Sequence, residues 1–161
     1  MSSKDLPPNF KLLTIWLLIG LLIFLGFQAW ERERNASRFQ LAGQTIVLTR
    51  APDGHFHWPG RVGQVDVDFL VDTGATSTAL PQALAERLGL TSLGAVQSRT
   101  AGGIAEGFAA RADITLDGGV SATQLVVTVL PHLDAPLLGM DVLGRLHFSQ
   151  KPGELRVTPK E

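Results

Sequence analysis

The sequence predicts a small all-β domain with one or two short helices, preceded by one long apolar helix. Three observations support this prediction. Residues 12–30 form an apolar run without a charged side chain, residues 41–161 are rich in short β-prone runs separated by turn residues, and one stretch within them has helical spacing. The length of 161 residues suits one domain and one additional segment. We therefore divide the chain into a tail and anchor (1–30), a linker (31–40) and a β domain (41–161).

The apolar run at residues 12–30 has the length of a membrane-spanning helix. At 1.5 Å per residue it would span about 28 Å, close to the thickness of the hydrocarbon core of a bilayer. Trp16 and Trp30 lie near its two ends, where aromatic rings favour the membrane interface. A cleaved signal peptide would be shorter and followed by a small-residue cleavage site, and a buried core helix would keep a polar stripe. We therefore expect a single-pass anchor in the lipid bilayer.

The charges that flank this run leave its orientation nearly balanced. Lys4 and Lys11 precede the run, whereas Arg32, Arg34 and Arg38 follow it among glutamates. A short tail before a large C-terminal domain favours a tail inside the cell and a domain outside it. We therefore expect the inner (plasma) membrane, with the domain on the periplasmic or extracytoplasmic side.

Composition excludes several classes of function. The chain has no cysteine, which excludes disulfides and thiolate chemistry, and a net charge of −1 with scattered acids and bases. No basic patch is present, so we expect no nucleic-acid partner. His55 and His57 share one face of a predicted strand, but two ligands are fewer than a closed metal site requires. We therefore predict no metal.

Turns separate the elements of the β domain. The predicted strands share β-branched and apolar side chains, and they lie at residues 45–49, 55–62, 65–71, 108–116, 120–130 and 146–149. Glycine marks the turns between them, at residues 51–54, 63–64, 117–119 and 151–153. In the run 65–71, apolar side chains alternate with acids up to Phe69, which places the apolar set on one face. Residues 81–88 predict a helix, with Pro81 at its first position and Gly89 just beyond its end.

An acidic residue directly follows the predicted strand at 65–71. Residues 69–76 have the sequence FLVDTGAT, in which a buried strand would hold the carboxylate of Asp72 rigidly. Gly74 permits a sharp turn that directs an N–H towards this carboxylate, and Thr73 is expected to donate a hydrogen bond to a neighbouring loop. A carboxylate fixed before substrate arrives is suited to activating water. For this motif alone, an ordinary Asx turn at the end of a strand is the alternative.

Two further segments accompany this motif. Residues 136–143 (PLLGMDVL) combine a short apolar pair, a glycine and the start of a helix. Residues 100–107 (TAGGIAEG) form a glycine-rich tip between two runs that are suited to strands, for which a plain hairpin loop is the alternative.

Together the three segments resemble the aspartic proteases. Within that family the chain is most similar to the single-domain, retropepsin-like members, and specifically to bacterial membrane-anchored ones that share a Leu-Leu-Gly-Met stretch. The resemblance covers about residues 45–157. It implies a small closed acid-protease β-barrel, endopeptidase activity on a peptide or protein substrate, water as the nucleophile, and no cofactor.

The resemblance also implies a role for individual residues. Asp72 would be the catalytic acid. Residues that support the active site would be Thr73, Gly74, Ala75, Leu138 and Gly139. A mobile flap that closes over bound peptide and excludes water would contain Ala101, Gly102, Gly103 and Ile104. The chain departs from the viral members at Thr76 and Met140, where those usually carry an Asp–Arg ion pair near the dimer contact.

One aspartate in such a site implies two chains. The mechanism needs two carboxyl groups that share a proton, because two like charges so close together resist ionising together. This chain has one Asp-Thr-Gly and is too short for a second lobe. We therefore expect a homodimer in which each subunit contributes Asp72, assisted by confinement of both copies to the membrane.

Two other functions are compatible with the same sequence. One is a non-catalytic, membrane-tethered module for peptide binding or dimerisation, because the fold can bind extended peptides by strand addition. The other is self-processing, in which the protease cuts its own linker at residues 31–40. The intact Asp-Thr-Gly-Ala sequence favours catalysis, since binding alone does not need that carboxylate.

Overall fold

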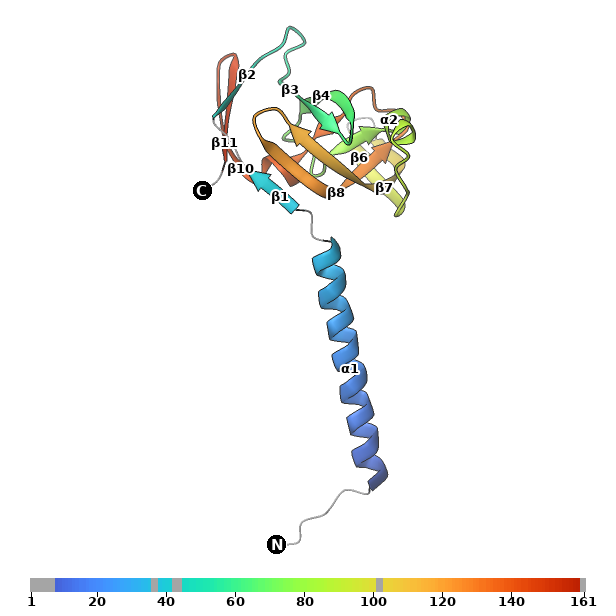
Figure 1. Ribbon diagram of the computed structural model, residues 1–161. Helices are drawn as coiled ribbons and strands as arrows, with labels where there is room; N and C mark the ends of the chain where they lie inside the picture. Colours follow the sequence, from blue (N-terminus) through green and yellow to red (C-terminus); the bar gives the residue numbers. More distant parts are fainter. Residues whose placement is uncertain (1–7, 36–37, 42–44, 101–102, 160–161) are drawn as a thin grey trace. The chain divides into compact units, whose positions relative to one another are not determined.

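The chain divides into two compact units, residues 1–36 and 37–161. The structure is a computed structural model, and it describes residues 8–35, 38–41, 45–100 and 103–159 (Figure 1). Each unit is described by itself below.

The first unit contains one helix, α1 (Pro8–Asn35), of 28 residues. The apolar run at 12–30 is therefore helical. Large apolar side chains are exposed along α1: Leu12, Ile15, Trp16, Leu17, Leu18, Ile19, Leu21, Leu22, Ile23, Phe24, Leu25 and Phe27. In the part of the chain that the structure describes, no helix combines the length and the apolarity that crossing a membrane requires. Where the sequence predicts a linker at 31–40, α1 continues to Asn35 and a strand, β1 (Arg38–Leu41), follows.

The second unit is a closed β-barrel, as the resemblance implies. Among the described residues, a ring of strands closes through the pairing of β7 with β8. In spatial order the ring consists of β8 (Val120–Leu130), β5 (Ala79–Pro81), β9 (Leu137–Leu138), β4 (Val65–Val71), β3 (His57–Val62) and β7 (Gly103–Leu116). The pairing of β1 with β8 and of β6 (Gly94–Thr100) with β7 extends this sheet at both ends. A second sheet has the order β10 (Leu146–Lys151), β11 (Glu154–Pro159), β2 (Ile46–Thr49).

Alternating side chains of the strands fill the barrel. On β4, Phe69 is fully buried whereas Asp66 and Asp68 are exposed, which confirms the predicted inward and outward faces. Trp58 on β3 is also fully buried, and its indole N–H donates to the carbonyl of Asp117 at 2.9 Å. Burial of such apolar side chains supplies the main driving force for folding. The barrel thereby becomes a rigid support for the loop that follows β4.

A strand is present in each of the six ranges predicted for strands, and the predicted helix is present. The hairpin β3–β4 turns at Gly63, whose φ of 58° suits glycine. Helix α2 (Gln82–Arg87) begins one residue after Pro81, which ends β5 and occupies the N-cap, rather than at Pro81 itself. A second short helix, α3 (Met140–Leu143), begins directly after Gly139. The strands β5 and β9 contain only three and two residues, too few to show a period in sequence.

Candidate active site

The carboxylate of Asp72 lies at the end of β4 and is held there by its own loop. The parallel pairing of β4 with β9 places Val71 beside Leu138, and the N–H of Asp72 donates to the carbonyl of Leu138 at 3.1 Å. The N–H of Gly74 donates to Asp72 Oδ1 at 2.8 Å, as predicted from the sequence. The N–H of Ala75 donates to the carbonyl of Asp72 at 3.2 Å, which closes the turn. The acid is half-buried, and its orientation is therefore fixed by backbone groups.

A buried threonine and an aspartate fasten this loop to α3. The side chain of Thr78 is fully buried, and its hydroxyl donates to Asp141 Oδ1 at 2.8 Å. The N–H of Thr78 donates to Asp141 Oδ2 at 2.8 Å, and the N–H of Val142 donates to Oδ1 at 2.9 Å. The Thr78 hydroxyl also accepts a hydrogen bond from the N–H of Gly139 at 3.2 Å. We call this group of contacts the Thr78–Asp141 latch.

Backbone contacts reinforce the latch on both sides of Gly139. The N–H of Met140 donates to the carbonyl of Ala75 at 2.8 Å, and the N–H of Asp141 donates to the carbonyl of Thr76 at 3.1 Å. A Cβ atom at position 139 would overlap the carbonyl carbon of Ser77 and lie 2.7 Å from its oxygen. Because these atoms belong to the backbone, they cannot move aside, so this close approach requires glycine. The supporting role that the resemblance implies for Leu138 and Gly139 thus has a physical basis.

A cleft of about 1120 Å³ opens in front of the acid. Asp72 and the residues 74–77 line it on one side, and the β6–β7 hairpin lines it on another through residues such as Ile104. The segment that follows β8 contributes further lining residues, among them His132. The cleft therefore joins the acid, the hairpin and the segment after β8 in one space.

The residues predicted for the flap are only partly described. Ala101 and Gly102 lie outside the described residues. Gly103 begins β7 with a φ of 114°, and Ile104 lines the cleft with 69% of its surface exposed. Strand β6 pairs with β7 from Gly94 opposite Ala109 to Thr100 opposite Gly103, and both the flap and the plain hairpin loop contain such a hairpin, so the flap stays a prediction.

Thr73 is exposed, and its predicted contact with a neighbouring loop stays a prediction. A hydrogen bond of this kind is made by Thr78, five residues further along, which the sequence did not single out. Asp141, the partner of Thr78, lies in the first turn of α3, where acidic side chains are favoured. This position is the one feature of the sequence that could have indicated a structural role for Asp141.

Several groups in and near the cleft were also missed. The hydroxyls of Ser77 and Thr128 both face it, 3.3 Å apart, because β5 pairs in parallel with β8 and brings Ala79 beside Thr128. This proximity depends on strand order, which local sequence patterns do not contain.

No group of three or more His, Cys, Asp or Glu within the described ranges is arranged to hold a metal ion.

Comparison with known proteins agrees with this geometry. The family model described as "gag-polyprotein putative aspartyl protease" matches residues 58–145, which contain the acid, the hairpin and the latch. The chain is 33% identical to the uncharacterized protein in the cobV 5′ region of a Sinorhizobium species, over 97% of this chain and 76% of that protein. It is 30% identical to the uncharacterized protein RP867 of Rickettsia prowazekii, over 89% of this chain and 68% of that protein.

Among solved structures, the chain is similar to the crystal structure of a retropepsin-like aspartic protease from Rickettsia conorii. The two are 27% identical with a TM-score of 0.56, and the match covers 76% of this chain and 93% of the other.

Proposed function

Because the chain belongs to the retropepsin-like aspartic proteases, we propose that it is an endopeptidase that uses Asp72 to activate water. One observation carries the proposal. The Gly74 N–H occupies Oδ1 of Asp72, while Oδ2 accepts no hydrogen bond among the described residues and the acid borders the cleft. One oxygen is thus used for orientation, and the other is free to take part in proton transfer.

The second carboxyl group would come from a second copy of the chain. A two-fold axis beside the loop 72–75 would bring the two Asp72 side chains together, and one shared proton would relieve the repulsion between them. The ionised carboxylate would accept a proton from water as the water oxygen attacks the scissile carbonyl carbon. The protonated carboxyl would donate its proton to the carbonyl oxygen, which gives a tetrahedral gem-diol intermediate. The acid that took the proton from water would then donate it to the leaving nitrogen, while the other acid takes a proton back from a gem-diol hydroxyl as the C–N bond breaks, so that the amine leaves and the dyad again holds one proton. No cofactor enters these steps.

The walls of the cleft suit a peptide in an extended conformation. Apolar side chains from three segments line it, namely those of Ala75, Leu130 and Leu137. The hairpin β6–β7 stands at its edge, where closure over the substrate would exclude bulk water. We therefore propose peptide or protein substrates with apolar side chains near the scissile bond.

Digestion of a mixed peptide library tests this function. We expect new termini to appear across a pH series, and we expect an inhibitor that mimics the tetrahedral transition state of aspartic proteases to suppress them. Mass spectrometry of the products reports the cleaved bonds. Binding of library peptides without any new terminus would instead support the non-catalytic peptide-binding module.

No helix among the described residues by itself meets the length and apolarity of a membrane span. On the evidence of the sequence, we nevertheless propose that the apolar run at 12–30 anchors the chain in the plasma membrane, with the protease domain outside the cytoplasm. The uncharged run at 12–30 and the exposed apolar side chains along α1 support this, because a surface of this kind is rarely left in water. The full-length chain is expected to sediment with membranes and to resist alkaline extraction. Recovery of full-length chain in the supernatant would contradict the anchor.

A further inference from the structure

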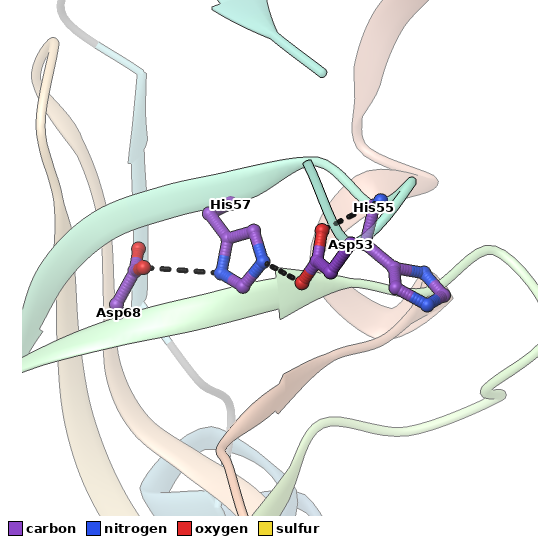
Figure 2. Close-up of polar contacts among 4 residues, drawn as sticks. All are labelled: Asp53, His55, His57 and Asp68. Carbon is purple, nitrogen blue, oxygen red and sulfur yellow. Dashed lines mark hydrogen bonds and ion pairs between the residues drawn. The ribbon is translucent and has the colours of Figure 1, made fainter. Parts of the chain in front are cut away.

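One imidazole ring lies between two carboxylates on the outer face of β3 and β4. His57 Nε2 is 2.8 Å from Asp53 Oδ2, and His57 Nδ1 is 3.0 Å from Asp68 Oδ2 (Figure 2). Asp53 belongs to the turn 51–54 that precedes β3, whereas Asp68 lies on β4. The ring therefore joins the turn to β4, the strand that Asp72 directly follows. We call these three side chains the His57 bridge.

The geometry of the His57 bridge does not suit a metal ion. The two carboxylates contact opposite nitrogens of the ring, so they cannot converge on one cation. Figure 2 shows the ring of His55 directed away from that of His57, and the Asp53 carboxylate instead accepts the backbone N–H of His55 at 2.9 Å. The arrangement is that of a proton-dependent contact between two segments.

The protonation state of the His57 ring determines whether it can donate hydrogen bonds to one or to both of the carboxylates of Asp53 and Asp68. A neutral imidazole donates from one nitrogen and can serve one carboxylate, whereas an imidazolium donates from both. The hydrogen bond with Asp53, together with the charge of Asp68, raises the pKa of His57 against a smaller opposing effect of burial. The hydrogen bonds from the backbone of His55 and the ring of His57 lower the pKa of Asp53.

The charged groups around the ring favour the imidazolium. From the turn, Asp53 contacts the ring; from β4, Asp68 contacts it and Asp66 lies two residues further along the same face. From β3 itself, Arg61 lies opposite Asp66 in the strand register, four residues from His57. Of these groups only Asp53 and Asp68 contact the ring, and these two acids favour the imidazolium.

Backbone contacts connect the turn to the catalytic loop. Phe56, the residue before His57, accepts a hydrogen bond at its carbonyl from the N–H of Val71 at 2.9 Å. His57 itself lies beside Leu70 in the β3–β4 register. Asp72 is the next residue after Val71, so the position of the turn affects the strand end from which the catalytic acid projects.

We propose that His57 is a positioning residue: its protonated ring clamps the turn 51–54 to β4 and thereby steadies the end of β4 that carries Asp72. The clamp is closed in mildly acidic medium and opens as the pH rises. The part of this inference that concerns catalysis rests on the proposed peptidase function, whereas the clamp itself does not.

The direction of the pH dependence follows from the two pKa shifts. Because the pKa of His57 is raised by folding, its contribution to stability is fully present below its ordinary value of 6.5 and is lost as the pH rises through the raised value. Because the pKa of Asp53 is lowered, its contribution is present above its ordinary value of 3.8 and is lost as the pH falls through the lowered value. The clamp is therefore strongest between about pH 4 and pH 6.5.

Amide hydrogen exchange on the full chain tests the clamp. After correction for the intrinsic pH dependence of exchange, protection of the amides at positions 55 and 71 is expected to fall between pH 5.5 and pH 8.5, both in the wild type and in His55→Gln, the matched control two residues away from His57. In His57→Gln, protection at Val71 should already be low at pH 5.5 and should change little. Equal profiles for Val71 in wild type and His57→Gln would overturn the proposal.

A second variant keeps the test decisive if His57→Gln folds poorly. Asp68→Asn retains the ring and removes one of its two acidic partners, so the titration midpoint of His57, followed by NMR, is expected to shift downwards. An unchanged midpoint would show that Asp68 does not hold the ring, and it would overturn the clamp.

Peptide cleavage tests the positioning role separately. The ratio of kcat for wild type to kcat for His57→Gln is expected to exceed one at pH 5.5 and to fall towards one as the pH rises. A ratio that does not vary with pH would overturn the positioning role. If the wild type cleaved no peptide at all, the peptidase function would fail, and the amide protection and NMR results would still decide whether the clamp exists.

Discussion

Replacing Asp72 with asparagine is expected to lower kcat for peptide cleavage by roughly a thousandfold or more while the fold stays intact. The amide group cannot accept a proton from water, and it cannot carry the proton that the two carboxyl groups would share. Its oxygen still accepts the N–H of Gly74, which donates to Asp72 Oδ1 at 2.8 Å, so the loop keeps its geometry. Kinetics with a cleaved library peptide measure the loss, and circular dichroism with thermal unfolding verifies the fold.

Asp66→Asn is the matched control for this substitution. It makes the same change of acid to amide on the same strand, but Asp66 is exposed on the outer face, opposite Arg61. We expect the control to retain wild-type kcat. Cleavage by Asp72→Asn at a rate near that of the control would remove Asp72 from the mechanism.

Mixing the two chains tests whether each site needs two copies of Asp72. If wild type and Asp72→Asn subunits exchange freely, active sites with two acids form in proportion to the square of the wild-type fraction. Activity at fixed total protein is therefore expected to fall faster than linearly as the Asp72→Asn chain replaces the wild type. A linear fall would show that one acid from one chain suffices, and the dimeric site would be wrong.

The sequence was informative wherever the determining contacts are local. Alternating side chains in 65–71 predicted the buried face of β4, and the glycine after Asp72 predicted the N–H that binds its carboxylate. These features depend on neighbours within a few residues. The closed barrel itself came from the family resemblance, since strand order depends on pairing between distant segments such as β5 and β8.

The contacts that the sequence missed are those made at long range. Thr78 and Asp141 are separated by 63 residues along the chain, and nothing in the sequence around Thr78 indicates that its hydroxyl is fully buried. The sequence predicts a supporting hydrogen bond for Thr73, which adjoins the acid, but contains no signal for the one that Thr78 makes. Strand β5, which follows Thr78, and strand β9, which precedes α3, bring the two residues together. Each of these strands is too short to be predicted from a periodic pattern in the sequence.

The Thr78–Asp141 latch leads to the second prediction of large effect. Asp141→Ala is expected to lower the free energy of unfolding by about 3 kcal/mol, because hydrogen bonds to a charged acceptor are worth more than neutral ones and buried donors lose their partner. The Thr78 hydroxyl and N–H both donate to this carboxylate at 2.8 Å, and Thr78 is inaccessible to water that might replace it. Urea unfolding of the full chain, followed by tryptophan fluorescence, measures the change.

Activity should respond to this change as well, since the latch fixes the loop from which Asp72 projects. Loss of the Asp141 side chain removes both acceptors of Thr78, whereas the backbone N–H of residue 141 can still donate to the carbonyl of Thr76. The loop is therefore loosened at Thr78. Asp141→Asn keeps one oxygen acceptor but turns an N–H₂ group towards the second donor, so its stability is expected to lie between those of wild type and alanine. Asp66→Ala, which removes an exposed acid, is the control and should change stability by less than about 0.5 kcal/mol. If Asp141→Ala were as stable as that control, the latch would not hold the loop, and the orientation of Asp72 would depend on the backbone hydrogen bonds of the loop 72–76.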